Sequence, residues 1–95
     1  MLDSKKRSYL SKLAIDMDPI FQVGKSSLTT ELISAIEQAI DKRELIKISV
    51  LKNCLDDPRE IGETIAERTR SEVVRVIGKK IILYKQNKKN PKITW

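Results

Sequence analysis

The chain has 95 residues, the length of one small domain, and combines 19 Lys or Arg with 13 Asp or Glu for a net charge of +6. One cysteine and no histidine exclude His-based triads, Cys/His zinc clusters and a disulfide within the chain. The longest apolar runs are four residues, whereas a membrane span needs about 20 and a signal peptide about 7 to 15. We therefore expect a small cytoplasmic domain with no membrane partner.

The charge is divided unevenly along the chain. Residues 1–12 carry a net +3, residues 78–95 a net +6, and residues 13–77 a net −3. An asymmetry of this kind suggests a field that faces a polyanion such as a nucleic acid. The alternative is that the Lys-rich ends only keep a small protein soluble.

The first predicted element is an amphipathic helix over residues 4–17, which Asp3 or Ser4 can cap. Pro19 ends the helical pattern, and residues 20–23 predict a short strand. The apolar stripe of the helix consists of Leu10, Leu13, Ala14 and Met17, and the basic residues outside that stripe are Lys5, Arg7 and Lys12.

A loop over residues 24–27 leads to a predicted helix over residues 29–42, with Thr29 as its N-cap. Residues 44–51 alternate between apolar and polar side chains, which predicts a strand with one buried face and one face that is at least partly wet. The buried set is Ile46, Ile48 and Val50, and the wet set is Lys47 and Ser49.

Asp57 and Pro58 predict the start of a third helix, which extends to about residue 69, because an aspartate N-cap followed by proline suits a first helical turn. Two final strands are predicted over residues 73–77 and 81–85, with a hairpin turn at Gly78, Lys79 and Lys80 between them.

The expected fold is α/β (α+β-like two-layer), in the order α-β-α-β-α-β-β with a mixed four-stranded sheet. Strands joined through helices are expected to pair in parallel, and the hairpin to add an antiparallel strand. Helices would cover mainly one face and leave Lys47 and Arg75 on the more open face. Residues 1–85 form a single domain, and the basic tail over residues 86–95 lacks periodicity and is expected to be mobile.

The loop Gly24-Lys25-Ser26-Ser27 is the most informative stretch for function. It joins a strand to a helix N-terminus, where backbone N–H groups and the helix dipole attract phosphate. It is too short for a nucleotide-binding P-loop. The alternative is an ordinary turn whose Gly and Ser serve as turn and cap residues.

The acidic residues do not predict an enzyme. Helix capping explains Asp57 and Glu60, and no histidine is present to activate Cys54. We expect no catalytic residue, no metal, no cofactor and no small-molecule substrate. The four aromatic residues are too few for a base-stacking platform, so a bound nucleic acid would be held by backbone and shape.

Three blocks of the chain, at residues 20–29, 43–50 and 76–84, resemble the CRM domain family, whose stand-alone bacterial members are the YhbY-like proteins. The blocks read Ile-Phe-Gln-Val-Gly-Lys-Ser-Ser-Leu-Thr, Arg-Glu-Leu-Ile-Lys-Ile-Ser-Val and Val-Ile-Gly-Lys-Lys-Ile-Ile-Leu-Tyr. The resemblance implies a domain similar to the C-terminal domain of translation initiation factor three. It also implies RNA binding, in bacteria on precursors of the large ribosomal subunit and in plant organelles in group II intron splicing.

The chain departs from the family pattern at two positions. The family's loop is Gly-x-x-Gly, and here Ser27 replaces the second glycine. Arg70 stands where relatives usually have a glycine after the third helix. Both residues adopt a positive φ less easily than glycine, so the loop and the helix end are both in question.

We therefore predict a monomeric, non-enzymatic RNA-binding protein that acts on ribosomal RNA in assembly of the large subunit. Lys25 would contact phosphate beside the helix, while the basic ends would add diffuse attraction. The alternative is a protein-interaction adaptor that docks a basic partner without contacting RNA. The predicted RNA-binding residues are Gly24, Lys25, Ser26, Ser27, Lys47, Lys5, Arg7, Lys12, Lys79 and Lys80.

Overall fold

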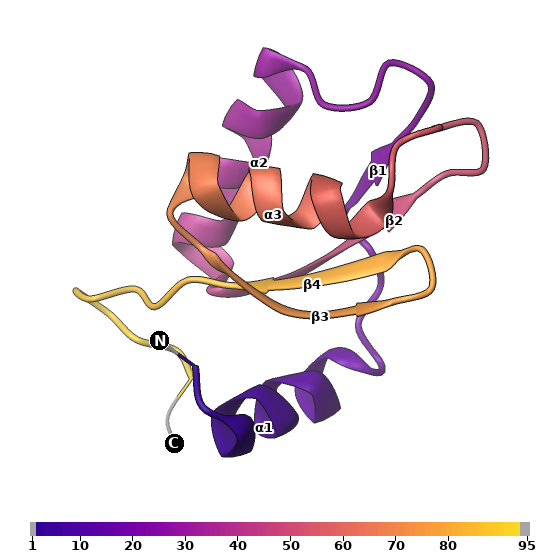
Figure 1. Cartoon of the computed structure of the whole chain (residues 1–95). Helices are drawn as coiled ribbons and strands as arrows, with labels where there is room; N and C mark the ends of the chain where they lie inside the picture. The colour runs from indigo at the N-terminus through magenta and orange to yellow at the C-terminus, as the bar shows by residue number, and fades with distance from the viewer. Residues whose placement is uncertain (1, 94–95) are drawn as a thin grey trace.

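Three helices and four strands follow one another in the predicted order in the computed structural model, which describes residues 2–93 (Figure 1). The elements are α1 Ser4–Ala14, β1 Phe21–Val23, α2 Thr30–Arg43, β2 Leu45–Val50, α3 Pro58–Thr69, β3 Glu72–Ile77 and β4 Lys80–Tyr84. No helix within residues 2–93 is long and apolar enough to cross a membrane.

Each helix begins at a predicted capping residue. The Asp3 carboxylate accepts from the Lys6 N–H at 2.8 Å, and the Asp57 carboxylate caps α3 in the same way ahead of Pro58. Thr29 caps α2. These caps satisfy N–H groups that have no partner within the helix, so they set where each helix starts. The first helix ends at Ala14, three residues earlier than predicted.

The strand order in the sheet is β1-β2-β4-β3. β1 pairs in parallel with β2, as predicted, but β4 lies between β2 and β3 and is antiparallel to both. The expected parallel pairing of β2 with β3 is therefore wrong. β4 occupies the centre because its apolar run, Ile81–Tyr84, suits a strand that is buried on both faces, whereas β3 carries the exposed Arg75 at the edge.

Helices α2 and α3 pack on one face of the sheet, and the larger core lies beneath them (Figure 1). The predicted alternation of β2 is confirmed, because Ile46, Ile48 and Val50 all belong to this core. Its other fully buried side chains include Val23, Ile36, Ile40, Ile65, Ile81 and Leu83.

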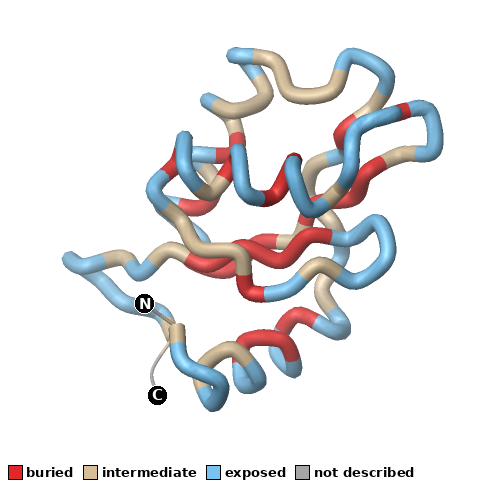
Figure 2. The backbone as a smooth tube through the Cα atoms, in the orientation of Figure 1, coloured by how far each residue is buried: buried red, intermediate tan, exposed pale blue. Residues whose placement is uncertain are grey.

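Helix α1 covers the opposite face and builds a second, smaller core, which Figure 2 shows as buried backbone on both α1 and the strands. Leu10 and Ala14 pack there against Ile82 and Tyr84 of β4. The element order, the mixed sheet and the packing of most helices on one face are confirmed, and α1 covers part of the face that we expected to be more open. Leu13, which we expected in the apolar stripe, is 41% exposed.

The tail over residues 86–93 lies along the body of the protein. The Asn87 side chain donates to a backbone carbonyl near the end of α2 at 3.1 Å. The Lys92 N–H donates to the fully buried carboxylate of Glu44, and Ile93 packs against the second core. The tail therefore has a defined path that its composition did not predict. Its mobility remains a prediction, and the last two residues lie outside the described part of the chain.

Arg70 ends α3 in the left-handed conformation, with φ 59° and ψ 38°. Its N–H and that of Ser71 both bond to the carbonyl of Ala66, which satisfies a carbonyl of the last helical turn. The helix thus ends as in a glycine-capped helix, and the arginine adopts a backbone conformation that costs a non-glycine residue of this kind about 1 kcal/mol.

Tyr84 is buried at the end of β4, next to Glu44. Burial, and then the negative charges of Glu44 and Glu72, raise the pKa of its phenol above the ordinary value of 10.0. A pKa that is higher in the folded than in the unfolded chain contributes stability that is fully present below pH 10 and is lost as the pH rises beyond it.

We expect the free energy of unfolding to fall as the pH rises above 10. In Tyr84→Phe, the part of this fall that comes from ionisation of Tyr84 should be absent. In an ultraviolet titration of the phenolate groups, the same variant should lose the step at the highest pH. A titration curve that keeps this step in Tyr84→Phe would contradict the assignment. Lysine titration affects both chains equally, so the comparison isolates Tyr84.

Candidate functional site

Three loops meet at the carboxyl ends of β1, β2 and β3, on the right-hand side of Figure 1. β1 and β2 are parallel, and β3 runs in the same direction because both β2 and β3 are antiparallel to β4. The following loops therefore emerge at one end of the sheet. We call the surface formed by residues 24–29, 51–57 and 78–79 the loop edge.

Backbone hydrogen bonds hold the three loops of the loop edge together. The Leu51 N–H donates to the Val23 carbonyl at 2.9 Å, which joins the first two loops. The Val50 N–H donates to the Lys79 carbonyl at 2.7 Å, which brings the hairpin turn to the end of β2. The relative positions of the loops thus follow from the sheet and not from flexible side chains.

The loop Gly24–Ser27 is a closed turn, because the Ser27 N–H donates to the Gly24 carbonyl at 2.9 Å. Ser27 has φ 55°, in the left-handed region where the family has glycine. The Ser27 hydroxyl also donates to the carboxylate of Asp56 in the neighbouring loop. The loop therefore keeps the left-handed backbone at this position despite the substitution, and the bond to Asp56 helps to hold it.

The backbone at Gly24 does not require glycine, whereas the backbone at Ser27 has the positive φ that favours glycine. A Cβ atom at this position would lie 3.6 Å from Asn53 Oδ1 and 3.7 Å from Leu51 Cδ1, which is ordinary contact. Among the glycines of the chain, Gly78 is the one with a positive φ, at the hairpin turn.

Three lysines project from the three loops of the loop edge. Lys25, Lys52 and Lys79 are all exposed, one on each loop. Lys80 lies beside them, and its ammonium donates to the Ser49 hydroxyl at 3.0 Å. The predicted residues Gly24, Lys25, Ser26, Ser27, Lys79 and Lys80 are therefore brought together at one end of the sheet.

Sequence reasoning missed Lys52 and Asn53. Both follow β2, the parallel neighbour of β1, and the carboxyl ends of parallel strands meet at the same edge of a sheet. That rule was enough to place residues 52 and 53 beside the first loop. The loop after β2 also carries Leu55, and 97% of this side chain is exposed.

Lys47 is half-buried and, contrary to our expectation, does not lie on an open face. α1 covers the face to which Lys47 points, and its ammonium there donates to three backbone carbonyls at the end of α1. A cation at a helix C-terminus satisfies carbonyls that have no partner within the helix and opposes the negative end of the helix dipole. The acceptors are the carbonyls of Ala14 at 3.1 Å, Ile15 at 3.3 Å and Met17 at 3.2 Å.

The basic residues of α1 lie on the other side of the sheet from α2. The Arg7 guanidinium donates to the carbonyls of Val73 and Val74, the latter at 2.9 Å, where the β3 register is irregular. Arg7 thereby ties α1 to the edge strand. Lys5 and Lys12 are exposed on α1. The predicted site residues therefore form two groups. One lies at the loop edge, and the other consists of Lys5, Arg7 and Lys12 on α1 together with Lys47, which contacts the end of α1.

The chemical candidates that we rejected occupy structural positions. Cys54 is 5% exposed and belongs to the larger core, although its neighbours in sequence, Asn53 and Leu55, are exposed. Asp57 caps α3. Among residues 2–93, no three His, Cys, Asp or Glu side chains are grouped so that they could hold a metal ion.

The relatives of this chain among known proteins are named as RNA-binding proteins. The chain is 42% identical over 93 residues to the "Probable RNA-binding protein YqeI" of Bacillus subtilis, covering 98% of this chain and 97% of the relative. It is 30% identical over 84 residues to an "RNA-binding protein" of Haemophilus influenzae, covering 88% of this chain and 85% of the relative.

The fold is similar to a solved structure as well. The solution structure of SAV1595 from Staphylococcus aureus, a hypothetical protein described as a candidate RNA-binding protein, matches with a TM-score of 0.84 and 46% identity. The match covers 99% of this chain and 98% of the other. The family model of the CRS1/YhbY (CRM) domain matches residues 2–85. Sequence, fold and family model agree, and the chain belongs to the CRS1/YhbY (CRM) domain family.

Proposed function

We propose that the chain binds RNA at the loop edge. The observation that carries this proposal is the exposed Lys25 in a closed turn that leads into α2, with Lys52 and Lys79 on the adjacent loops. Backbone N–H groups at a helix start, hydroxyls and ammonium groups are the usual ligands of nucleic-acid phosphates. Relatives named as RNA-binding proteins support the choice of RNA.

The loop edge would hold the RNA backbone rather than individual bases. Its cationic groups are lysines, which act as point charges on phosphates, and the described loops carry no aromatic side chain on which a base could stack. Ser26 adds a hydroxyl donor at the tip of the turn. The exposed Leu55 offers an apolar contact beside the lysines for a sugar or an unpaired base.

We further propose that this RNA is ribosomal RNA in precursors of the large subunit, bound in the cytoplasm by a monomer without catalysis. The support is the family resemblance of residues 2–85 and the structural positions of Cys54 in the larger core and of Asp57 at the start of α3. The proposal is tested in cells by crosslinking the protein and sequencing the bound RNA. Recovery of RNA other than large-subunit precursors would contradict it.

Lys25→Ala should weaken RNA binding about fivefold at 0.15 M salt and lower the slope of log affinity against log salt by about 0.9, the value for one phosphate contact. Lys25 is exposed and has no hydrogen-bond partner among the described residues, so its loss should not affect folding. A filter-binding salt titration measures both quantities.

The matched control is Lys42→Ala, which removes an equally exposed lysine from the far end of α2. An equal loss of affinity in both variants would mean that the chain attracts RNA only through its net charge. The rival function, a protein-interaction adaptor, predicts that neither variant changes RNA affinity and that ribosome association survives high salt and RNase.

A further inference from the structure

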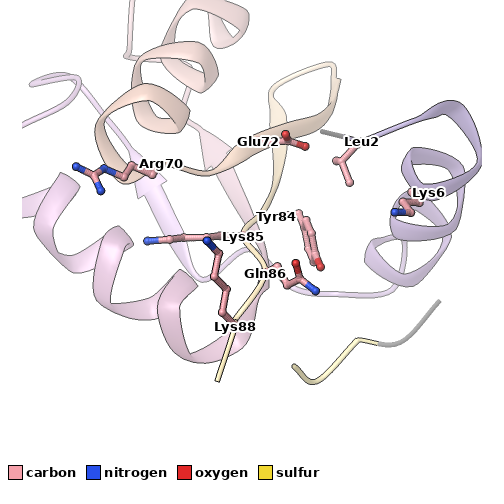
Figure 3. Close-up of a pocket in the computed structure, with 8 residues that line it drawn as sticks. All are labelled: Leu2, Lys6, Arg70, Glu72, Tyr84, Lys85, Gln86 and Lys88. Carbon is pink, nitrogen blue, oxygen red and sulfur yellow. The ribbon is translucent and has the colours of Figure 1, made fainter. Parts of the chain in front are cut away.

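A second cationic surface lies at the opposite end of the sheet from the loop edge. A cavity of about 430 Å³ opens where β4 ends, and we call it the tail pocket (Figure 3). Four cationic side chains line it, together with one acidic and one aromatic side chain. They are Lys6, Arg70, Lys85, Lys88, Glu72 and Tyr84.

The sheet register separates the tail pocket from the loop edge. Tyr84 pairs with Leu45 at the start of β2, whereas Val23, just before the first loop, pairs with Val50 at the end of β2. The two rows are five residue steps apart along β2, about 17 Å at the usual rise of a strand. The loops extend beyond one row and the tail beyond the other, so one phosphate group cannot contact both.

Two of the cations in the tail pocket are free to take a ligand. Arg70 and Lys88 are exposed, and neither side chain has a hydrogen-bond or ion-pair partner within residues 2–93. The ammonium of Lys85 is 2.7 Å from Asp41, so its charge is already balanced. In Figure 3, Arg70, Lys85 and Lys88 extend to the same side of the end of β4, away from Lys6.

The wall formed by the tail is held in place by its own contacts. The Asn87 Oδ1 atom accepts from the N–H groups of Lys89 and Asn90 at 3.1 and 3.2 Å, which fixes the turn next to Lys88. The carboxylate of Glu44 accepts from the Lys92 N–H, and its other oxygen is buried without a partner among the described residues. The buried carboxylate of Glu44 therefore anchors the tail, and these hydrogen bonds determine the position of Lys88.

The two basic ends of the chain meet at this surface. Leu2 and Ile93 pack against the same core cluster. Residues 2–12 and 85–93 contribute a dense positive charge, with Asp3 as their one acid. The bases are Lys5, Lys6, Arg7 and Lys12 in the first segment and Lys85, Lys88, Lys89 and Lys92 in the second. Of these, Arg7 and Lys85 are already bonded to β3 carbonyls and to Asp41, and Lys12 lies in the last turn of α1.

We propose that the tail pocket is a second phosphate-binding site and that one molecule joins two RNA segments, one at each end of the sheet. The proposal rests on RNA binding at the loop edge. Arg70 offers a planar fork of donors for a phosphate group, and Lys88 adds a point charge. The lysines of the tail then extend the attraction along the backbone beyond the pocket.

The test is a bridging experiment with short, blunt-ended RNA duplexes, one labelled with a donor dye and the other with an acceptor. The duplexes are kept shorter than the distance between the two sites, so that one duplex cannot occupy both. Wild-type protein should produce energy transfer between the two duplexes, in a complex whose native mass corresponds to one chain and two duplexes. Fluorescence anisotropy measures the affinity for a single duplex in parallel.

The pocket variant combines Arg70→Gly with Lys88→Ala, since glycine suits the left-handed backbone of residue 70 and keeps the fold. We expect it to lose at least about fivefold in energy transfer while its affinity for a single duplex changes less than about twofold. The charge-matched control, Arg68→Ala with Lys42→Ala, removes exposed cations outside the pocket and should bridge like the wild type.

Three outcomes would overturn the second site. They are wild-type protein that binds one duplex but gives no transfer, a pocket variant that bridges normally, and a bridged complex that contains two protein chains. Each of these leaves RNA binding at the loop edge standing. If the wild type binds no duplex in the anisotropy arm, the proposed function fails and the second site fails with it.

Discussion

Replacing Lys25, Lys52 and Lys79 together by alanine is expected to lower the affinity for an RNA duplex about a hundredfold at 0.15 M salt. Each lysine sits on a different loop of the loop edge and is exposed, so each can meet a separate phosphate. Three phosphate contacts correspond to a slope of log affinity against log salt of about 2.7. A slope of this size changes the affinity about a hundredfold between 1 M and 0.15 M salt. A filter-binding titration over a range of salt concentrations measures both values.

The control for this triple variant carries the same change in charge elsewhere. Lys42, Arg43 and Arg68 are exposed near the ends of α2 and α3, away from the loop edge. Their triple replacement by alanine should leave most of the affinity intact. If the two variants lose affinity and slope equally, RNA responds to the total charge of the protein and the loop edge is not the site.

Lys47→Ala is expected to destabilise the fold by about 2 kcal/mol and to leave RNA binding by the folded protein unchanged. The substitution removes a charged donor from three carbonyls at the end of α1, and hydrogen bonds of charged groups contribute about 1.5 to 3 kcal/mol. The helix dipole adds about 0.3 to 1 kcal/mol. The half-buried side chain keeps some access to water, which limits the loss. Denaturant unfolding followed by circular dichroism measures the change.

Lys12→Ala is the matched control for Lys47→Ala, because it removes an exposed lysine from the same helix. Its free energy of unfolding should stay within about 0.5 kcal/mol of the wild type. A stable Lys47→Ala protein that binds RNA weakly would contradict the structural role and restore Lys47 to the RNA surface. The pair of variants therefore decides between the two roles for the same side chain.

The helices and strands were largely predictable because their signals are local. Thr29 and Asp57 cap helices that begin one residue later, and the alternation of Ile46, Ile48 and Val50 correctly marks the buried face of β2. A cap or a two-residue period depends on neighbours within a few positions, so it can be read from the chain directly. The Gly24–Ser27 loop between β1 and α2 was predicted for the same reason, and its binding of phosphate stays a prediction.

The strand order and the surroundings of Lys47 were not predictable in the same way. The uninterrupted run Ile81–Tyr84 was a sign that β4 is buried on both faces, and reading it so would have placed β4 inside the sheet and a helix on each side. Once α1 covers the second face, Lys47 can reach only the end of that helix. An alternating strand shows which side chains share a face, but not whether another element covers it.

The sequence by itself determined the elements, the basic character of both ends and the loop that leads into α2. Only the tertiary structure decided that Lys52 and Lys79 join Lys25 at one end of the sheet, and that the two basic ends of the chain meet at the other. The physical reason is that composition and local spacing act along the chain. Proximity between residues far apart in sequence arises only when the strands pair and the apolar faces are buried together.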